Sequence, residues 1–519
     1  MKTNFLKLLI ACLPLAAFSQ KFTVSKSERV KYYVLTDMID KGQTNSTYFN
    51  VVVDPTGIRL DVYDKTTLKL KNSTTYNPVT NESNPTIDVK KAVGFKNCIY
   101  VFFTLSSNTY SITGMNTQYG YYFQRFDENG KVDGSKGSIG EFIYACDAHL
   151  IADSSKLLVF NVGEDIRGKK QIEEECTGEN LNNFFFAQKI DTIKAFIFDE
   201  NKTFKKIETP GLKRNYMYNY TSWDDFVSVL CVNREFKQEK GKSAVWLNII
   251  TANFTTKMRT EVKLDFPGKS IQDANITYDK NSKKIIVSGF YTNLTPKSTM
   301  GKDIDGLLVV ELNGVTGESI SQKTIPISKE DVATINETPV EKVKDDKGIS
   351  KFYTTKYIQN WDDGTITMIA ELRYRKCNSD QTDMAEKVLI FTIPSSKTSC
   401  KVNILDKIQV NRYKFTSIFP FEKNGKLYIM YNDHPENLKV SASGAMKLTD
   451  PSLGILVAAE ISKDGSFIKQ KICDNSGDDI YITKGENFPD GTLIFPVETD
   501  VPYIKSFTPS DHKGKMILK

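Results

Sequence analysis

Hydrophobic positions along this chain follow the periodicity of β-strands and rarely that of helices. Runs of five to eight residues rich in Val, Ile, Tyr, Phe and Thr recur between turn residues, and they either alternate with polar positions or are continuous. Alternation with a period of two places one face of a strand in a core. The pattern therefore predicts an all-β protein.

One kind of turn recurs before strongly apolar strands at intervals that average about 65 residues. A second kind follows another apolar strand and alternates with the first. The first kind comprises Lys96-Asn97, Ser154-Ser155, Asp224-Asp225, Asn281-Ser282, Asp362-Asp363, Lys423-Asn424 and Pro489-Asp490. The second comprises Asp54-Pro55, Asp127-Glu128, Asp199-Glu200, Thr251-Ala252, Asn313-Gly314, Pro394-Ser395 and Lys463-Asp464. The alternation indicates a repeated supersecondary unit.

One unit can be followed in full over residues 274–278, 284–290, 306–312 and 320–327. These segments predict four antiparallel strands, here called A to D in chain order. A radial array of such units is a β-propeller, which protects the strand edges that an open sheet exposes. The turns predict a propeller of about seven four-stranded blades.

Ring closure can also be inferred. Too little chain follows Pro489-Asp490 for a whole blade. At the N-terminus, Tyr48–Val53 and Ile58–Tyr63 are two expected strands that belong to no complete four-stranded unit. We expect N-terminal strands to complete the last blade. Eight blades follow instead if Val30–Met38 and Lys515–Leu518 pair independently, and a two-domain β-sandwich is the alternative architecture.

The connections between strands differ strongly in length. In a four-stranded blade the A–B and C–D turns lie on one face of the disc, and these turns are short here. The long B–C loops are residues 106–118, 163–191, 234–242, 292–305, 373–386 and 432–452, and the longest D–A connection is 328–350. Loops of this length are usually functional, so we expect the working surface on their face. The alternative is solvated decoration.

Aromatic residues gather near two of these connections and are the candidate partner-binding residues. They are Tyr110, Tyr119, Tyr121, Tyr122, Tyr216, Tyr218, Tyr220 and Trp223. Aromatic side chains among Asn, Ser and Thr provide large contact area at low entropic cost, as interface anchors do. Alternatively, every second tyrosine faces the core between blades.

The N-terminus has the pattern of a secretory signal. A basic region, Met1–Lys7, precedes the apolar stretch Leu8–Phe18, which is too short to span a bilayer. We predict cleavage after Ser19, which leaves residues 20–519 as one propeller domain without a transmembrane segment. In a rival interpretation, Leu9-Ile10-Ala11-Cys12 is a lipobox and Cys12 carries a lipid.

Composition excludes several kinds of chemistry. A net charge of +6 over 519 residues is too small a bias to indicate nucleic-acid binding. Three histidines and the lack of a C-x-x-C pair argue against a metal centre, so we predict neither metal nor cofactor. Cys377 and Cys400 flank one expected strand and are the candidate disulfide.

No catalytic residue stands out. His149 and His434 each lie beside an aspartate, but adjacency in sequence does not make a site. Trp223-Asp224-Asp225 and Trp361-Asp362-Asp363 repeat a motif on predicted A–B turns, where aspartate stabilises the turn. Carboxylates paired across a central channel would suit a glycosidase, although nothing marks which pair.

Three features together resemble the β-propeller-like envelope proteins of bacteria that use type IX secretion. They are the signal ending Ala17-Phe18-Ser19-Gln20, the composition rich in Lys, Asn and Thr, and the degenerate blades. The resemblance implies an exported protein that is periplasmic or associated with the outer membrane, and an accessory or plug-like subunit of a secretion translocon. No C-terminal sorting module is recognisable in Asp511–Lys519, which favours a periplasmic resident.

Two functional hypotheses follow. The first is a non-enzymatic scaffold that binds a protein partner in the envelope through its insertion-rich face. The second is a carbohydrate-active propeller that binds or hydrolyses glycans in its central channel. A scaffold should expose an apolar patch on the loop-bearing face, whereas an enzyme should gather acidic, basic or tyrosine side chains at the channel mouth.

Overall fold

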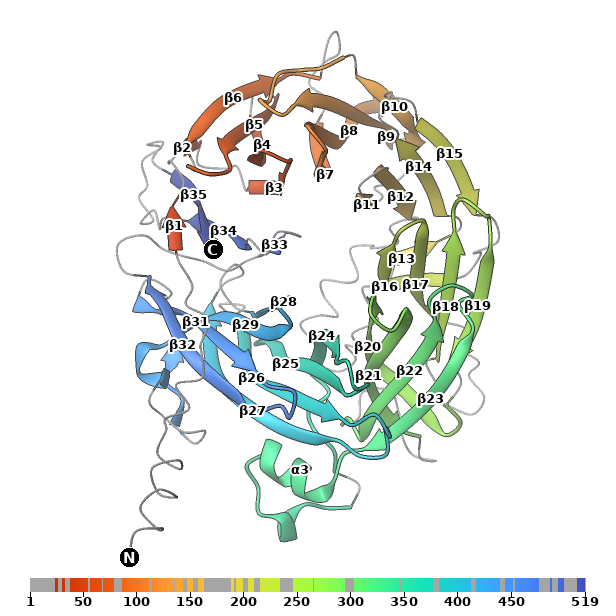
Figure 1. Ribbon diagram of the computed structural model, residues 1–519, viewed down its shortest axis with the longest axis vertical. Helices are drawn as coiled ribbons and strands as arrows, with labels where there is room; N and C mark the ends of the chain where they lie inside the picture. The colour runs from red at the N-terminus through yellow and green to blue at the C-terminus, as the bar shows by residue number, and fades with distance from the viewer. Residues whose placement is uncertain are drawn as a thin grey trace, which may run out of the picture.

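Strands dominate the chain in the computed structural model, and they group into eight sheets around a central axis (Figure 1). The protein is therefore a β-propeller, as the sequence predicts. The structure describes residues 24–26, 30–32, 38–54, 57–67, 69–78, 86–111, 114–134, 136–142, 147–152, 157–162, 188–190, 193–198, 204–209, 215–233, 246–264, 266–294, 303–345, 347–376, 382–411, 417–438, 444–450, 453–475, 486–487, 493–498 and 511–518.

The first four blades use strands up to Leu264. Blade 1 contains β3 (Met38–Gln43), β4 (Thr47–Asp54), β5 (Gly57–Asp64) and β6 (Leu70–Tyr76). Blade 2 contains β7 (Thr86–Phe95), β8 (Cys98–Ser111), β9 (Gly114–Asp127) and β10 (Gly137–Phe142). Blade 3 contains β11 (Asp147–Ala152), β12 (Leu157–Val162), β14 (Ile193–Phe198) and β15 (Phe204–Thr209). Blade 4 contains β16 (Asn215–Trp223), β17 (Phe226–Asn233), β18 (Trp246–Asn253) and β19 (Arg259–Leu264), with β13 (Gln188–Ile190) beside β16.

The remaining blades follow the same order. Blade 5 contains β20 (Lys269–Asp279), β21 (Lys284–Asn293), β22 (Gly306–Asn313) and β23 (Ser319–Pro326). Blade 6 contains β24 (Tyr353–Asn360), β25 (Ile366–Lys376), β26 (Thr382–Ile393) and β27 (Lys401–Asn411), with β30 (Lys447–Leu448) beside β27. Blade 7 contains β28 (Phe419–Lys423), β29 (Lys426–Asp433), β31 (Ile455–Ile461) and β32 (Phe467–Asp474). Blade 8 contains β33 (Glu486–Asn487), β34 (Leu493–Glu498) and β35 (Asp511–Leu518).

N-terminal strands complete blade 8, as expected, but they are not the strands that the sequence suggested. β1 (Val24–Lys26) and β2 (Val30–Tyr32) both pair with β35 and supply its outer neighbour. Tyr48–Val53 and Ile58–Tyr63 instead lie in β4 and β5 of blade 1. The count of seven is therefore wrong and the alternative of eight sheets holds, with side chains described in six of them.

The missing blade follows from one unrecognised turn. Thr44–Ser46 join β3 to β4 as an A–B turn, which the Thr44 N–H closes by donating to Thr47 O at 2.8 Å. Asp54-Pro55 is therefore a B–C turn. The C–D turns of blades 1 and 4 begin at Asp64 and Asn253 instead of at the second-kind turns read from the sequence. In each, the side chain of the first residue accepts backbone N–H groups. Asp64 accepts from Thr67 at 2.8 Å, and Asn253 accepts from Thr256 at 2.8 Å.

Apolar side chains fill the spaces between neighbouring blades. One core lies between blades 5 and 6 around Phe290, Ile325 and Phe391, and another lies between blades 6 and 7 around Ile390 and Tyr431. Along the outer strands β6 and β19, exposed residues alternate with half-buried ones. Exposed lysines on these strands discourage edge-to-edge pairing, and they are Lys71, Lys263, Lys323, Lys401 and Lys471.

A repeated polar contact joins each of several blades to the next. A side chain on an outer strand donates to a carbonyl of the following C–D turn, beside a glycine of positive φ that allows the close approach. The pairs are Asn72 to Asn129 O at 2.9 Å, Thr260 to Thr316 O at 2.6 Å and Asn403 to Asp464 O at 3.5 Å. The glycines are Gly130, Gly317 and Gly465, with φ of 80°, 73° and 82°.

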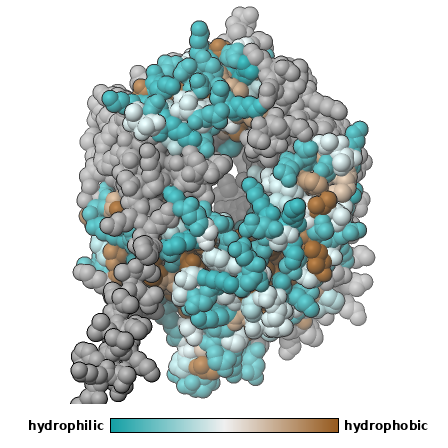
Figure 2. All heavy atoms as spheres, in the orientation of Figure 1, coloured by the Kyte–Doolittle hydropathy of each residue, from teal (hydrophilic) through white to brown (hydrophobic). Residues whose placement is uncertain are grey.

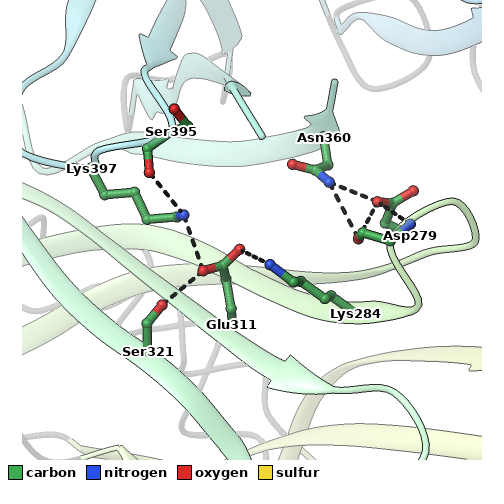
Figure 3. A network of polar contacts seen from close by, with 8 residues as sticks. Asp279, Lys284, Glu311, Ser321, Asn360, Ser395 and Lys397 are labelled. Atoms are coloured by element: carbon green, nitrogen blue, oxygen red, sulfur yellow. Dashed lines mark hydrogen bonds and ion pairs between the residues drawn. The ribbon is translucent and has the colours of Figure 1, made fainter. Parts of the chain in front are cut away.

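Between blades 5 and 6, a cluster of charged side chains replaces this hydrogen bond as the polar contact that joins neighbouring blades (Figure 3). Glu311 on β22 lies 3.1 Å from Lys284 Nζ and 3.0 Å from Lys397 Nζ, and it accepts a hydrogen bond from Ser321 at 2.8 Å. Burial acts to raise the pKa of Glu311, but the bonds from Lys397, Ser321 and Lys284 outweigh it and lower that pKa. Lys397 belongs to blade 6, so the cluster ties the two blades together.

Candidate partner-binding face

The two faces of the disc differ in their connections. The turn face carries the A–B and C–D turns, and the loop face carries the B–C and D–A connections. Two predicted B–C loops are shorter than expected, because β8 and β9 form a hairpin through residues 98–127 and β25 and β26 extend to Lys376 and from Thr382. Residues 163–187 and 234–242 lie outside the described residues. The three-residue strand β13 follows the first of these two segments. Two insertions on the loop face are described over most of their length, the first over 327–345 and 347–352 and the second over 434–438, 444–450 and 453–454.

The first insertion is the D–A connection between blades 5 and 6. It folds into helix α3 (Lys329–Ile335) and the 3-10 turn η2 (Val340–Lys342), and the Ser328 side chain caps the helix by accepting from Asp331 N at 3.0 Å. Val332, Ala333 and Ile335 are buried in the core between the two blades. The insertion is therefore a packed element of the fold, visible beside β27 in Figure 1.

A lysine fixes the end of this helix to blade 6. Lys387 on β26 donates to Ile335 O at 3.2 Å and forms an ion pair with Glu337. A cation at the last carbonyls of a helix is favourable because those carbonyls lack partners within the helix. The contact holds the insertion against the strand that lies beneath it.

The second insertion is the B–C connection of blade 7. It contains the 3-10 turn η3 (Pro435–Leu438) and β30, which pairs in parallel with Ile408 and Gln409 of β27. Asn437 is 2% exposed and organises the loop. Its Nδ2 donates to Asp433 Oδ1 at 2.6 Å and to Met446 O at 2.9 Å, and its Oδ1 accepts from Met446 N at 2.6 Å. Blade 7 thereby covers the edge of blade 6.

Both insertions approach the same outer strand at Asp406. Burial raises the pKa of this carboxyl group, Lys387 and Lys469 act to lower it, and Glu337 adds to the rise. Lys469 on β32 also donates to Asp406 O at 3.3 Å and to Asn437 O at 3.5 Å. Glu337 of the first insertion and Lys469, which bonds the second insertion at Asn437, therefore both act on Asp406 of blade 6.

Aliphatic side chains are exposed on these insertions. Leu453 is 68% exposed, Met446 is 50% exposed and Val340 is 39% exposed. In the view of Figure 2 the described surface is largely hydrophilic, and its hydrophobic residues form small separate groups. Exposed aliphatic residues within a polar surface suit a protein interface.

The predicted aromatic anchors are mostly structural where their side chains are described. Tyr121 is 2% exposed and Trp223 is 5% exposed, so neither is available to a partner. The Trp223 ring stacks on Tyr278 at 4.1 Å, within the core between blades 4 and 5. Tyr122 lies under Lys136 Nζ at 4.5 Å, and Tyr220 is half-buried. Trp223 lies between blades 4 and 5, as the alternative for alternate aromatics expects, whereas Tyr121 is buried against other residues of blade 2.

The other aromatic candidates take different positions. Tyr218 on β16 donates its hydroxyl to Asp273 Oδ1 at 2.6 Å and thus joins two blades. The backbones of Tyr110, Tyr119 and Tyr216 lie in β8, β9 and β16, and their side chains lie outside the described residues. Sequence alone favoured aromatic anchors over aliphatic ones, because nothing in the sequence shows which ring a neighbouring blade covers.

The candidate disulfide is wrong. Cys400 carries a free thiol, and burial raises its pKa to about 12. Cys377 lies outside the described residues, directly after Lys376. Lys376, the residue before Cys377, pairs with Thr382, and Lys401, the residue after Cys400, pairs with Thr392 near the opposite end of β26. Ten residues of strand span about 33 Å, far beyond the reach of a disulfide.

The described part of the chain gives no sign of metal chemistry or of a membrane-spanning helix. No group of three His, Cys, Asp or Glu side chains within it could hold a metal ion. None of its helices is long and apolar enough to cross a bilayer. His434 lies in the second insertion, where its Nδ1 accepts from Glu436 N at 3.3 Å, and His149 has no described side chain.

Buried charges lie beneath the loop face in blade 6. Glu371 and Lys407 are both fully buried and lie 2.8 Å apart, and Ser417 donates to Glu371 at 3.0 Å. Burial acts to raise the pKa of Glu371, but Lys407 and Lys356 lower it. Removing one member of such a pair costs more than the pair contributes. These groups have partners and join β25 and β27 of blade 6 to the segment that leads into blade 7.

No protein-family model and no curated protein matches this sequence. Among solved structures, the chain resembles the Dos1 propeller at 9% identity over 95% of this chain and 94% of that one, with a TM-score of 0.45. A polysaccharide lyase of family PL25, an ulvan lyase, aligns at 8% identity over 86% and 96% of the chains with a TM-score of 0.36. A post-proline cleaving enzyme from Rickettsia typhi aligns at 10% identity over 92% of this chain and 58% of that one, with a TM-score of 0.33.

Proposed function

We propose that this protein is a non-catalytic propeller that binds a protein partner through its loop face. The observation that supports this role is the pair of insertions flanking blade 6. Both are fixed to the blades by packing or hydrogen bonds, and both expose aliphatic side chains. A preformed surface binds with a small ordering cost, which favours a docking role.

In the same proposal, the partner lies in the bacterial envelope. The support is the secretory pattern of Met1–Phe18 and the resemblance to envelope propellers of bacteria with type IX secretion. An accessory or plug-like subunit of an outer-membrane translocon is the most specific form of this role. A carbohydrate-active propeller needs accessible acidic groups near the channel; Asp273 on the inner strand β20 is fully buried, whereas the Asp88 side chain on the inner strand β7 is 55% exposed.

The test compares two surface variants with the parent protein. Met446→Asp/Leu453→Asp places charges on the second insertion, and Val315→Asp places one on a C–D turn of the opposite face, where Val315 is 57% exposed. Each tagged protein is incubated with detergent-solubilised envelope from the source bacterium, and the retained proteins are quantified by mass spectrometry. Burial of one aliphatic side chain contributes about 1.5–3 kcal/mol, so at least a tenfold loss of retained partner is expected for the double variant.

Retention of the partner by parent and Val315→Asp, with loss in the double variant, supports docking on the loop face. Equal retention by all three proteins contradicts the assignment of the face. Recovery of bare monomer in all three contradicts the scaffold role and directs the search to glycan binding by the central channel.

A further inference from the structure

One carboxylate joins the inner strands of three consecutive blades. Asp273 on β20 is fully buried. Its Oδ1 accepts the hydroxyl of Tyr218 from β16 at 2.6 Å, and its Oδ2 accepts the backbone N–H of Thr355 from β24 at 2.5 Å. Blades 4, 5 and 6 therefore meet at a single side chain.

Each of the three strands contains a bulge near the residue that takes part in these contacts. The register of β16 shifts between Met217 and Asn219, that of β20 between Ile271 and Asp273, and that of β24 between Thr355 and Tyr357. A bulge adds one residue and redirects nearby side chains. Because β16 contacts β20 and β20 contacts β24, the three bulged segments lie side by side.

The charge of Asp273 is only partly compensated. The titratable groups that face it are Tyr218 from β16 and Lys356 from β24. Burial raises the pKa of Asp273, although the bonds from Tyr218 and Thr355 and the charge of Lys356 act to lower it. The pKa of Tyr218 lies well above its ordinary value, mainly through burial, so its hydroxyl stays protonated.

Protonation removes the buried charge and keeps both contacts. A protonated Oδ1 can donate to the Tyr218 oxygen, whose own proton then turns away, while Oδ2 still accepts the Thr355 N–H. In the ionised form Tyr218 is the donor in the first contact, and the carboxylate carries a desolvated charge.

We propose that Asp273 is a pH-sensitive clamp on the inner strands, which holds blades 4, 5 and 6 together more firmly when protonated than when ionised. The sign follows from linkage. A group whose pKa is higher in the folded than in the unfolded state stabilises fully below the unfolded value of 3.8. That stability is lost as pH rises through the folded value. β24 begins directly after the first insertion, so the clamp acts at the base of the loop-face element.

Asp273→Asn tests the clamp because an asparagine reproduces the neutral form. Its Oδ1 can accept from Thr355 and its Nδ2 can donate to Tyr218. The matched control is Asp279→Asn at the other end of β20, where the pKa of the native carboxyl is lowered because bonds from Ser282 and Asn360 outweigh burial. Hydrogen exchange of a peptide covering 353–360 is measured from pH 4 to 7 and corrected for the intrinsic rate.

The clamp predicts similar protection in parent and Asp273→Asn near pH 4, and at least threefold greater protection in the variant at pH 7. Asp279→Asn should show no such gain. A ratio that does not change with pH, or weaker protection of Asp273→Asn at pH 7, overturns the proposal. If Asp273→Asn does not fold, the pH dependence of exchange in the parent protein is the test. Protection of 353–360 must fall with pH relative to the peptide 366–370, and a constant ratio refutes the clamp.

Discussion

Replacing Glu311 tests the account of how blades 5 and 6 are held together. Glu311 and Lys397 have side chains that are 8% and 11% exposed, and the two groups lie 3.0 Å apart. Glu311→Gln keeps the shape and leaves the Lys397 charge without its counter-charge. Loss of one partner from a buried pair costs about 3–5 kcal/mol. The contribution of Lys284 is discounted because that side chain is 34% exposed, so we expect a loss of about 2–4 kcal/mol.

The assay is urea unfolding at pH 7, followed by tryptophan fluorescence and far-UV circular dichroism together. The control is Glu318→Gln, an exposed carboxyl in the C–D turn of the same blade, which should change stability by less than about 0.5 kcal/mol. Since the pKa of Glu311 is lowered by folding, its contribution should be present above pH 4.5 and disappear as pH falls through the lowered value. A Glu311→Gln loss no larger than that of the control would refute the reasoning.

Two further predictions concern the second insertion and ring closure. Asn437→Ala removes three hydrogen bonds and should destabilise the insertion locally by about 2–4 kcal/mol, seen as faster hydrogen exchange over 444–450, whereas Glu436→Ala on the exposed neighbour should not. Unchanged exchange in Asn437→Ala would contradict the role of that side chain. Deleting residues 20–32 leaves β35 without its outer neighbour, and we expect a larger hydrodynamic radius and faster proteolysis near blade 8. A peptide of residues 20–36 should reverse both effects, and a deletion variant as compact as the parent would show that these strands do not close the ring.

The architecture was predictable because its signals are local. The first-kind turns at Lys96-Asn97, Asn281-Ser282 and Lys423-Asn424 all join strands A and B, since turn residues and apolar strands leave a direct pattern. The Thr44–Ser46 turn escaped notice because β3 before it, Met38–Gln43, has no apolar run. One unrecognised turn changed both the number of blades and the identity of the closing strands.

The candidate site was less predictable because it depends on contacts between blades. Trp223 and Leu453 are both large hydrophobic residues near connections, yet Trp223 is buried against Tyr278 and Leu453 is exposed. Only the position of the neighbouring blade separates these cases. In the same way, nothing near Asp273 in the sequence indicates Tyr218 or Thr355, which lie 55 and 82 residues away.

Site-specific photo-crosslinking tests the central claim most directly. A photoreactive amino acid is placed at Leu453 on the loop face or at Val315 on the turn face, and the protein is irradiated in the living source bacterium. Docking through the loop face predicts one abundant crosslinked envelope protein from position 453 and none of that species from position 315. Crosslinks of equal yield from both positions, or none from position 453, would contradict the proposed function.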